Sequence, residues 1–162
     1  MKNIEYIEII NYYGKEILES ENFQKEKKFI QHGNVSVYEH SVSVAIECIK
    51  IARHMQIPVD IKSLVRGALL HDFFLYDWHI KDDRHKWHGF THAQTALNNA
   101  KKEFELNDIE QNMIYCHMFP LNLRIPKYRE CSILCIADKI VATKETVSPY
   151  LEIIKRKKQY TQ

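Results

Sequence analysis

The 162 residues, 45% of them hydrophobic and 27% charged, have the length and composition of one folded domain rather than a disordered segment. A formal charge of only +2 gives no sign of the basic surface that a nucleic-acid polymer requires. No apolar run approaches the roughly 20 residues of a membrane span and no signal-peptide pattern is present, so we expect a cytoplasmic protein with reduced cysteines and no membrane partner.

Helices dominate the expected secondary structure. The chain has only four glycines and four prolines, which argues against a many-turned β fold, and no strand is convincing. Asp60 is suited to cap one helix, and Asn107 or Asp108 another. Apolar residues spaced three and four apart predict helices over 3–20, 21–30, 38–55, 61–72, 92–105, 107–117, 129–145 and 149–159. We therefore expect a single all-α domain over residues 1–162.

Residues 73–91 interrupt this pattern with an irregular stretch rich in aromatic residues and histidines. Irregular stretches of this length in compact domains are usually lids or binding loops. Tyr76 and Trp78 are candidates to line a pocket and to stack on a base. The alternative for Trp78 is that it simply anchors the loop to the core.

Four polar residues stand where the helical pattern predicts apolar ones. They are His40, His71, His117 and Asp138. Burial of a carboxylate costs on the order of several kcal/mol unless it is paired or bound to a cation. Alone, each histidine is more often a hydrogen-bonded core or surface group than a ligand. Several of them facing one core together with aspartates indicate a shared partner, for which divalent cations are suited.

The order and spacing of these residues resemble the HD superfamily of metal-dependent phosphohydrolases. The family pattern is a helical histidine, a His-Asp pair after an apolar helix, and a distant aspartate; two-metal members add two histidines between the pair and that aspartate. In chain order, the matching residues are His40, His71, Asp72, His92, His117 and Asp138. The resemblance spans about residues 35–145, and its spacing is closest to small bacterial two-metal members. Phe73-Phe74-Leu75 replaces the Ile-Gly-Lys of several relatives, and no Gly-Tyr-Pro follows, which argues against the branch that opens cyclic dinucleotides.

The resemblance implies a role for each ligand. Asp72 would bridge two metals. His40, His71 and Asp138 would complete the shell of one metal, and His92 and His117 that of the other. Imidazole and carboxylate ligands suit Fe, Mn, Co, Ni or Zn. A water bridging the two metals would become hydroxide and attack phosphorus.

Further residues are candidates for supporting roles. Lys139 could reach a substrate phosphate or be a surface lysine, and Arg124 and Lys127 could clamp an anion. His32 could support the metal ligands from behind or donate a proton to a leaving group. His88 lies one helical turn before His92, so it is either the rival ligand or a proton donor in catalysis.

Three functions agree with this site. The main hypothesis is hydrolysis of a phosphate ester or anhydride bond in a small nucleotide-like substrate. The alternatives are a di-iron oxygenase with the same ligands and a non-catalytic, nucleotide-binding regulator. The amphipathic end helices are compatible with a homodimer.

Overall fold

The computed structural model describes residues 3–78 and 88–159, with the side chains of 4–78 and 91–147. Helices make up most of this part of the chain, so the all-α prediction is confirmed. They are α1 (Asn3–Glu19), α2 (Glu21–Lys25), α3 (Val37–His54), α4 (Ile61–Leu70), α5 (His88–Glu103), α6 (Asp108–Cys116) and α7 (Arg129–Gln159), with a 3-10 turn η1 (Glu26–Lys28) and a hairpin of β1 (Ile30–His32) and β2 (Val35–Ser36). None of the described helices is long and apolar enough to cross a membrane.

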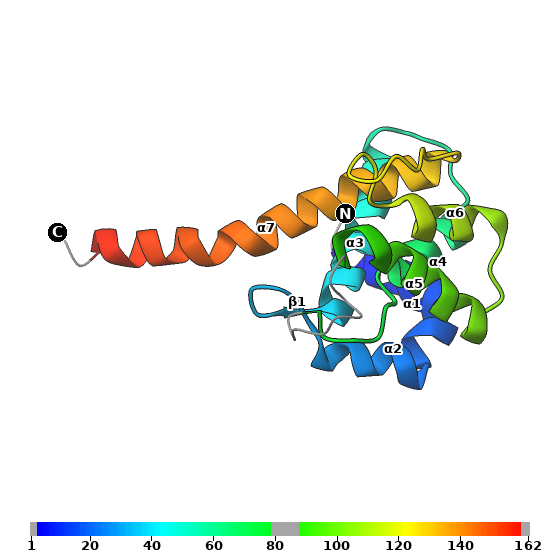
Figure 1. Ribbon diagram of the computed structural model, residues 1–162. Coiled ribbons are helices and arrows are strands. Elements are labelled where there is room, and N and C mark those ends of the chain that lie inside the picture. Colours follow the sequence, from blue (N-terminus) through cyan, green and yellow to red (C-terminus); the bar gives the residue numbers. More distant parts are fainter. Residues whose placement is uncertain (1–2, 79–87, 160–162) are drawn as a thin grey trace.

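The centre of the fold is the pair α3 and α4. Helix α3 packs against α4 and α7, and α4 packs in addition against α1 and α6. The first half of α7 lies on this body, and its second half extends away from it (Figure 1). The core side chains of these helices include Val44, Ile49, Leu69, Ile114 and Leu134, all fully buried.

Capping residues set where the central helices begin. The Ser36 hydroxyl accepts a hydrogen bond from the Glu39 amide, and Glu39 bonds back to Ser36, which forms a capping box at the start of α3. Asn107 and Glu110 form the same motif at α6, and Asp60 caps α4 by accepting from the amide of Ser63. These caps satisfy backbone N–H groups in the first turn and set the residue at which each helix begins.

The structure departs from the sequence-based helices in three places. The hairpin was not expected, because its strands are two and three residues long and show no alternation that a pattern can reveal; Gly33 turns it with a φ of 58°. Helix α5 begins at His88, four residues earlier than expected. Helix α7 runs through Pro149 without a break, since the turns before it are already nucleated against α3 and only one backbone bond is lost.

Candidate metal centre

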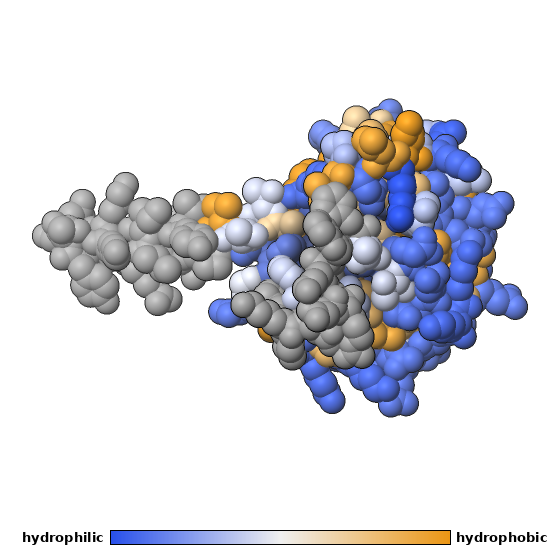
Figure 2. Space-filling view, viewed as in Figure 1, coloured by the Kyte–Doolittle hydropathy of each residue, from blue (hydrophilic) through white to orange (hydrophobic). Residues whose placement is uncertain are grey.

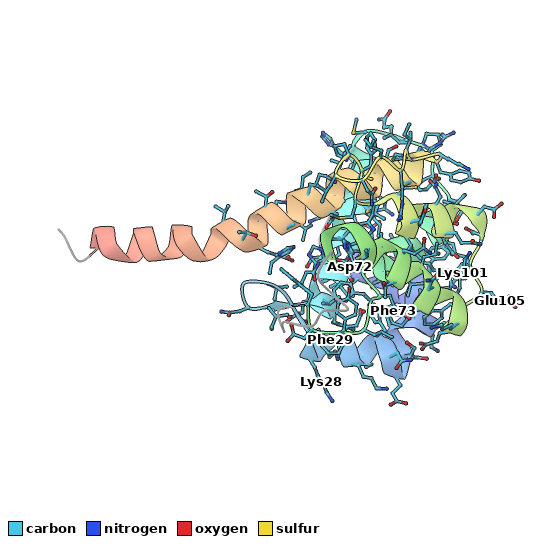
Figure 3. All side chains as sticks on the ribbon, in the orientation of Figure 1. Lys28, Phe29, Asp72, Phe73, Lys101 and Glu105 are labelled. Carbon is cyan, nitrogen blue, oxygen red and sulfur yellow. The ribbon has the colours of Figure 1, made fainter. Side chains whose placement is uncertain are left out.

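Six side chains from five helices and one turn converge in the interior of the body. His40 lies one turn into α3, His92 in α5 and Asp138 in α7. His71 and His117 are the C-cap residues of α4 and α6. Asp72 comes directly after His71, in the turn that follows α4, and is labelled in Figure 3. The four histidines and Asp72 are at most 4% exposed, so the expected burial is confirmed for His40, His71 and His117. The side chain of Asp138 is 14% exposed and only partly buried.

The two carboxylate oxygens of Asp72 face two different sets of histidines. Oδ1 lies 3.3 Å from Nε2 of His92 and 3.4 Å from Nε2 of His117. Oδ2 lies 3.3 Å from Nε2 of His71 and 3.9 Å from Nε2 of His40. The candidate ligand atoms therefore form two groups, each within 4.8 Å, that share Asp72.

Asp138 lies beside the group that His40 and His71 form with Asp72. Its Oδ1 lies 3.1 Å from Nε2 of His40 and 3.8 Å from Nε2 of His71. Helix α7 thus adds a second carboxylate on one side of Asp72, while the other side holds only His92 and His117 among the six residues.

Backbone carbonyls fix the tautomers of two of the histidines. Nδ1–H of His71 donates to the carbonyl of Ala68, and Nδ1–H of His117 donates to that of Ile114, both at 2.8 Å. In the neutral ring, each Nε2 then presents a lone pair toward Asp72. Nε2 of His71 and Oδ1 of Asp72 are both buried without a hydrogen-bond partner.

This arrangement fits a bound cation. Lone pairs of imidazole nitrogens that face carboxylate oxygens repel one another unless a positive charge lies among them. Nε2 of His92 and Nε2 of His117 lie 2.9 Å apart. Two nitrogen ligands that share one metal, each about 2.0–2.1 Å from it, lie roughly 2.9–3.4 Å apart, the range between a right-angled and a tetrahedral arrangement. The donors are imidazole nitrogens and carboxylate oxygens, a set that suits divalent transition metals.

The charges around the site shift its pKa values in opposite directions. Burial raises the pKa of Asp72, but His71, His117 and His92 outweigh it and lower the value well below the usual range. Burial lowers the pKa of His40, but Asp138 and Glu145 outweigh it and raise the value to about 9. Burial also lowers the pKa of His117, and this effect outweighs the opposing effect of Asp72, so that the value lies below its usual range. Burial lowers the pKa of His71 as well, but Asp72 and Asp138 outweigh it and raise the value well above its usual range. The carboxylates of the interior therefore attract positive charge, either from protonated imidazoles or from a bound cation.

A family model for the HD domain matches residues 37–143. The chain belongs to the HD-domain family. No curated protein and no solved structure matches the chain significantly. The family is of the metal-dependent phosphohydrolase type, and all six candidate ligands lie within the matched residues. The sequence resemblance over about residues 35–145 is therefore confirmed.

Two residues that support the HD-domain cluster were missed in the sequence, and both lie outside the matched region. The amide of Gln31, buried in β1, donates to Oδ2 of Asp72 at 2.6 Å. Oε2 of Glu145 lies 2.8 Å from Nδ1 of His40. Glu145 stands seven residues, or two helical turns, after Asp138, so helical spacing could have indicated it. Gln31 has no such signal, since only the unexpected hairpin brings it to the site.

Three further predicted residues lie near the cluster. The ring of His32 is 5.4 Å from that of His40, and a His32 nitrogen falls within 4.8 Å of ligand atoms of His40 and Glu145. The ring centroid of Tyr76 lies 4.9 Å from that of Phe74, with the two rings tilted by 45°. Burial, aided by the charge of Asp72, raises the pKa of Tyr76 to about 12. Trp78 is half-buried at the edge of the described loop. Their roles remain predictions.

The remaining predicted residues make other contacts. Nζ of Lys139 donates to the carbonyl of Cys135 at 3.1 Å, and the Arg124 guanidinium lies 3.8 Å above the ring of Tyr115. Lys127 lines a hollow with Tyr115 and Tyr128. No contact recorded for the described residues joins Lys139, Arg124 or Lys127 to the six candidate ligands, so phosphate or anion binding by them remains a prediction. The side chain of His88 lies outside the described residues.

Proposed function

We propose that this HD-domain protein is a phosphohydrolase that uses two divalent transition metals to cleave a phosphate ester or anhydride bond of a small nucleotide-like substrate. The observation that carries the proposal is the orientation of buried lone pairs around Asp72. One carboxylate serves two separate groups of ligands, and the backbone fixes the ring nitrogens that His71 and His117 offer.

The ligands would divide between two metals. His40, His71 and Asp138 would hold one, His92 and His117 the other, and Asp72 would contact both. When bound, two such metals supply Lewis-acid chemistry that activates water and stabilises charge on phosphoryl oxygens. A site that needed only a structural ion would be satisfied by one closed set of four ligands.

The chain's own residues would hold this site in shape. Gln31 donates to Oδ2 of Asp72 and so fixes the rotation of the carboxylate. Glu145 bonds to Nδ1 of His40 and keeps its Nε2 facing the interior. A histidine whose second nitrogen is paired with a carboxylate has a fixed ring orientation and is a better ligand.

Substrate contacts would come from the neighbouring side chains. Tyr76, a protonated phenol whose pKa is raised to about 12, can donate a hydrogen bond to a phosphoryl oxygen. His32 lies beside His40 at the edge of the cluster and can donate to the same group. The aromatic side chain of Trp78 is suited to stack on a nucleobase.

The proposal is tested on the full-length protein purified without chelator. We expect elemental mass spectrometry to find close to two transition metals per chain, and a panel of nucleotides and phosphodiesters to include one that turns over. In water enriched in oxygen-18, one heavy oxygen should enter the phosphate-containing product.

Other results would contradict the proposal. Oxygen consumption with a mixed-valent iron signal and no cleavage of P–O bonds would identify an oxygenase. Two bound metals with tight nucleotide binding but no turnover would identify a regulator. Absence of metal after reconstitution would exclude the mechanism altogether.

A further inference from the structure

The loop that joins α6 to α7 has an inverted pattern of burial. Leu121, Leu123 and Ile125 are 53%, 89% and 71% exposed, and they form what we name the apolar ridge. Asn122 and Arg124 alternate with them and are half-buried. Alternation of this kind is typical of an extended chain with one face toward the protein and the other toward its surroundings. In this loop the apolar side chains take the outer face.

Contacts on the inner face hold the loop in this orientation. The guanidinium of Arg124 lies 3.8 Å from the ring centroid of Tyr115 in α6. The backbone N–H of Lys127 donates to the side-chain oxygen of Asn112 at 3.0 Å, which ties the end of the loop to α6 as well. The side-chain amide of Asn122 is buried and has no hydrogen-bond partner among the described residues. Polar atoms inside and apolar side chains outside are both unfavourable in water, and a partner that removes the ridge from water offsets the second cost.

The apolar surface continues from the ridge along α7. Ile125 and Ile136, the latter 52% exposed, line the same hollow of about 420 Å³. The rest of its wall consists of Phe119, Pro120, Pro126, Ser132, Cys135 and Lys139. In Figure 2, hydrophobic residues gather at the top of the molecule, where Figure 1 draws this loop in yellow. Exposed apolar patches mark contacts with other proteins or with membranes.

The charged side chains beside the ridge are basic. Lys127, Arg129 and Lys139 are exposed, and none of them forms an ion pair with another described residue. Between residues 117 and 137 the only acidic residue is Glu130, which is 5% exposed. The exposed charges of this segment are therefore all positive, which makes its surface complementary to an anionic partner.

An anionic lipid surface fits this combination better than a second protein does. A stable protein–protein interface buries about 800 Å² on each partner, and a ridge of three side chains on one loop is small against such an area. A lipid surface requires less. Apolar side chains enter the boundary between headgroups and acyl chains, while basic side chains around them attract anionic headgroups.

We propose that the loop between α6 and α7 binds the surface of an anionic membrane. The apolar ridge inserts below the headgroups, and Lys127, Arg129 and Lys139 contact the headgroup phosphates. This contact does not depend on the proposed phosphohydrolase activity. It differs from the sequence-based expectation of no membrane partner, which considered only spanning segments and signal peptides; the ridge is revealed by its exposure in the folded chain.

The test is sedimentation of the full-length protein with lipid vesicles. Vesicles of phosphatidylcholine with about 30% phosphatidylserine provide the anionic surface. Vesicles of phosphatidylcholine alone provide the neutral one. We expect binding to the anionic vesicles to be at least about tenfold tighter, because anionic lipids attract the basic side chains beside the ridge. Salt at about 1 M should remove most of this difference, since it screens exposed charges.

Substitutions at exposed positions separate the ridge from the rest of the surface. Leu123→Ser combined with Ile125→Ser keeps the net charge and should weaken binding to the anionic vesicles about tenfold or more, because binding scales with the inserted apolar area. The control is Tyr12→Ser, at an aromatic side chain in α1 that is 78% exposed, which should leave binding unchanged. Thermal unfolding checks that both variants stay folded.

Three outcomes of the vesicle experiments would each overturn the proposal. They are no binding to the anionic vesicles, equal binding to both kinds of vesicle, and equal binding by the wild type and the double variant. A fourth outcome would identify the ridge as an interface between copies of this chain instead. It is a dimer in analytical ultracentrifugation that the double variant loses, together with no binding to vesicles.

Discussion

Two polar clusters in the described part of the chain differ in how fully their groups are paired, one around Arg66 and the other around Asp72. Arg66 in α4 donates from Nε to Glu110 at 2.8 Å, from one terminal nitrogen to Glu16 at 2.9 Å and from the other to the carbonyl of Glu105 at 3.0 Å. Every guanidinium nitrogen is paired. Around Asp72, by contrast, buried ring nitrogens face carboxylate oxygens, and two of these atoms lack a hydrogen bond.

The difference separates a structural cluster from one built for a ligand. Removing one partner of a closed ion pair leaves an uncompensated charge and destabilises the fold. Removing a member of a cluster suited to hold a cation should disturb the fold little but destroy the binding site. The two clusters should therefore respond in opposite ways to mutation and to metal.

Replacing the shared carboxylate gives the largest expected effect. Asp72→Ala should reduce activity to background and bound metal to less than half of the wild-type content, because both ligand groups lose their common member. The helical circular dichroism should stay unchanged. Elemental analysis and turnover measure the effect. A variant that kept most of its activity would contradict the role of Asp72 as a bridge.

Breaking the fully paired cluster around Arg66 should lower stability and leave metal binding unchanged. Arg66→Met leaves Glu110 buried without its partner and should lower the free energy of unfolding by about 3–5 kcal/mol. Metal content per folded chain should not change. The control is Arg53→Met, which removes an ion pair to Glu5 whose side chains are 37% and 45% exposed; that change should cost less than about 1 kcal/mol. Similar losses for both variants, in chemical denaturation, would contradict the distinction.

Adding metal should stabilise only those variants in which the cluster around Asp72 is intact. At a free metal concentration about 100 times the dissociation constant, binding to the folded state adds about 2.7 kcal/mol per site. Thermal unfolding of the wild type and of Arg66→Met should shift upward by similar free energies, and that of Asp72→Ala should not. A shift of equal size in Asp72→Ala would place the metal elsewhere in the chain.

The smallest expected effect comes from the hydrogen bond behind Asp72. Gln31→Met keeps the size of the side chain but removes the donor to Oδ2. Loss of such an outer contact should weaken metal affinity about 10–100-fold. The control is Gln111→Met, which removes a half-buried glutamine whose amide donates to the carbonyl of Leu106. Competition titration with a chromophoric chelator distinguishes the two, and equal affinities would refute the role of Gln31.

Much of the fold was predictable because local signals determine where helices begin. Asp60 and Asn107 cap the helices that were expected after them, and the capping contacts are present. The hairpin was not predictable, since its two short strands are held by pairing and by their contacts with α3 rather than by a sequence pattern. Helix α7 is one continuous helix where two helices were expected, over 129–145 and 149–159. A local pattern does not show that the turns before Pro149 are already stabilised by tertiary packing.

For the candidate site, the sequence by itself determined which polar residues stand at positions where the helical pattern predicts apolar ones. A histidine or aspartate on an apolar helical face is visible from spacing alone, and this is why His40, His71, His117 and Asp138 could be selected together. Membership of the HD-domain family followed from the order of those residues and was confirmed by the match over 37–143.

Only the tertiary structure decided how these residues meet. The two oxygens of Asp72 face two different groups of histidines, and Gln31 donates to one of these oxygens. Backbone carbonyls fix the rings of His71 and His117. How these groups meet in space depends on how the helices pack. Spacing along a chain fixes the face of one helix on which a side chain lies. The distance between side chains on different helices is set by how the helices pack against one another, which no local pattern records.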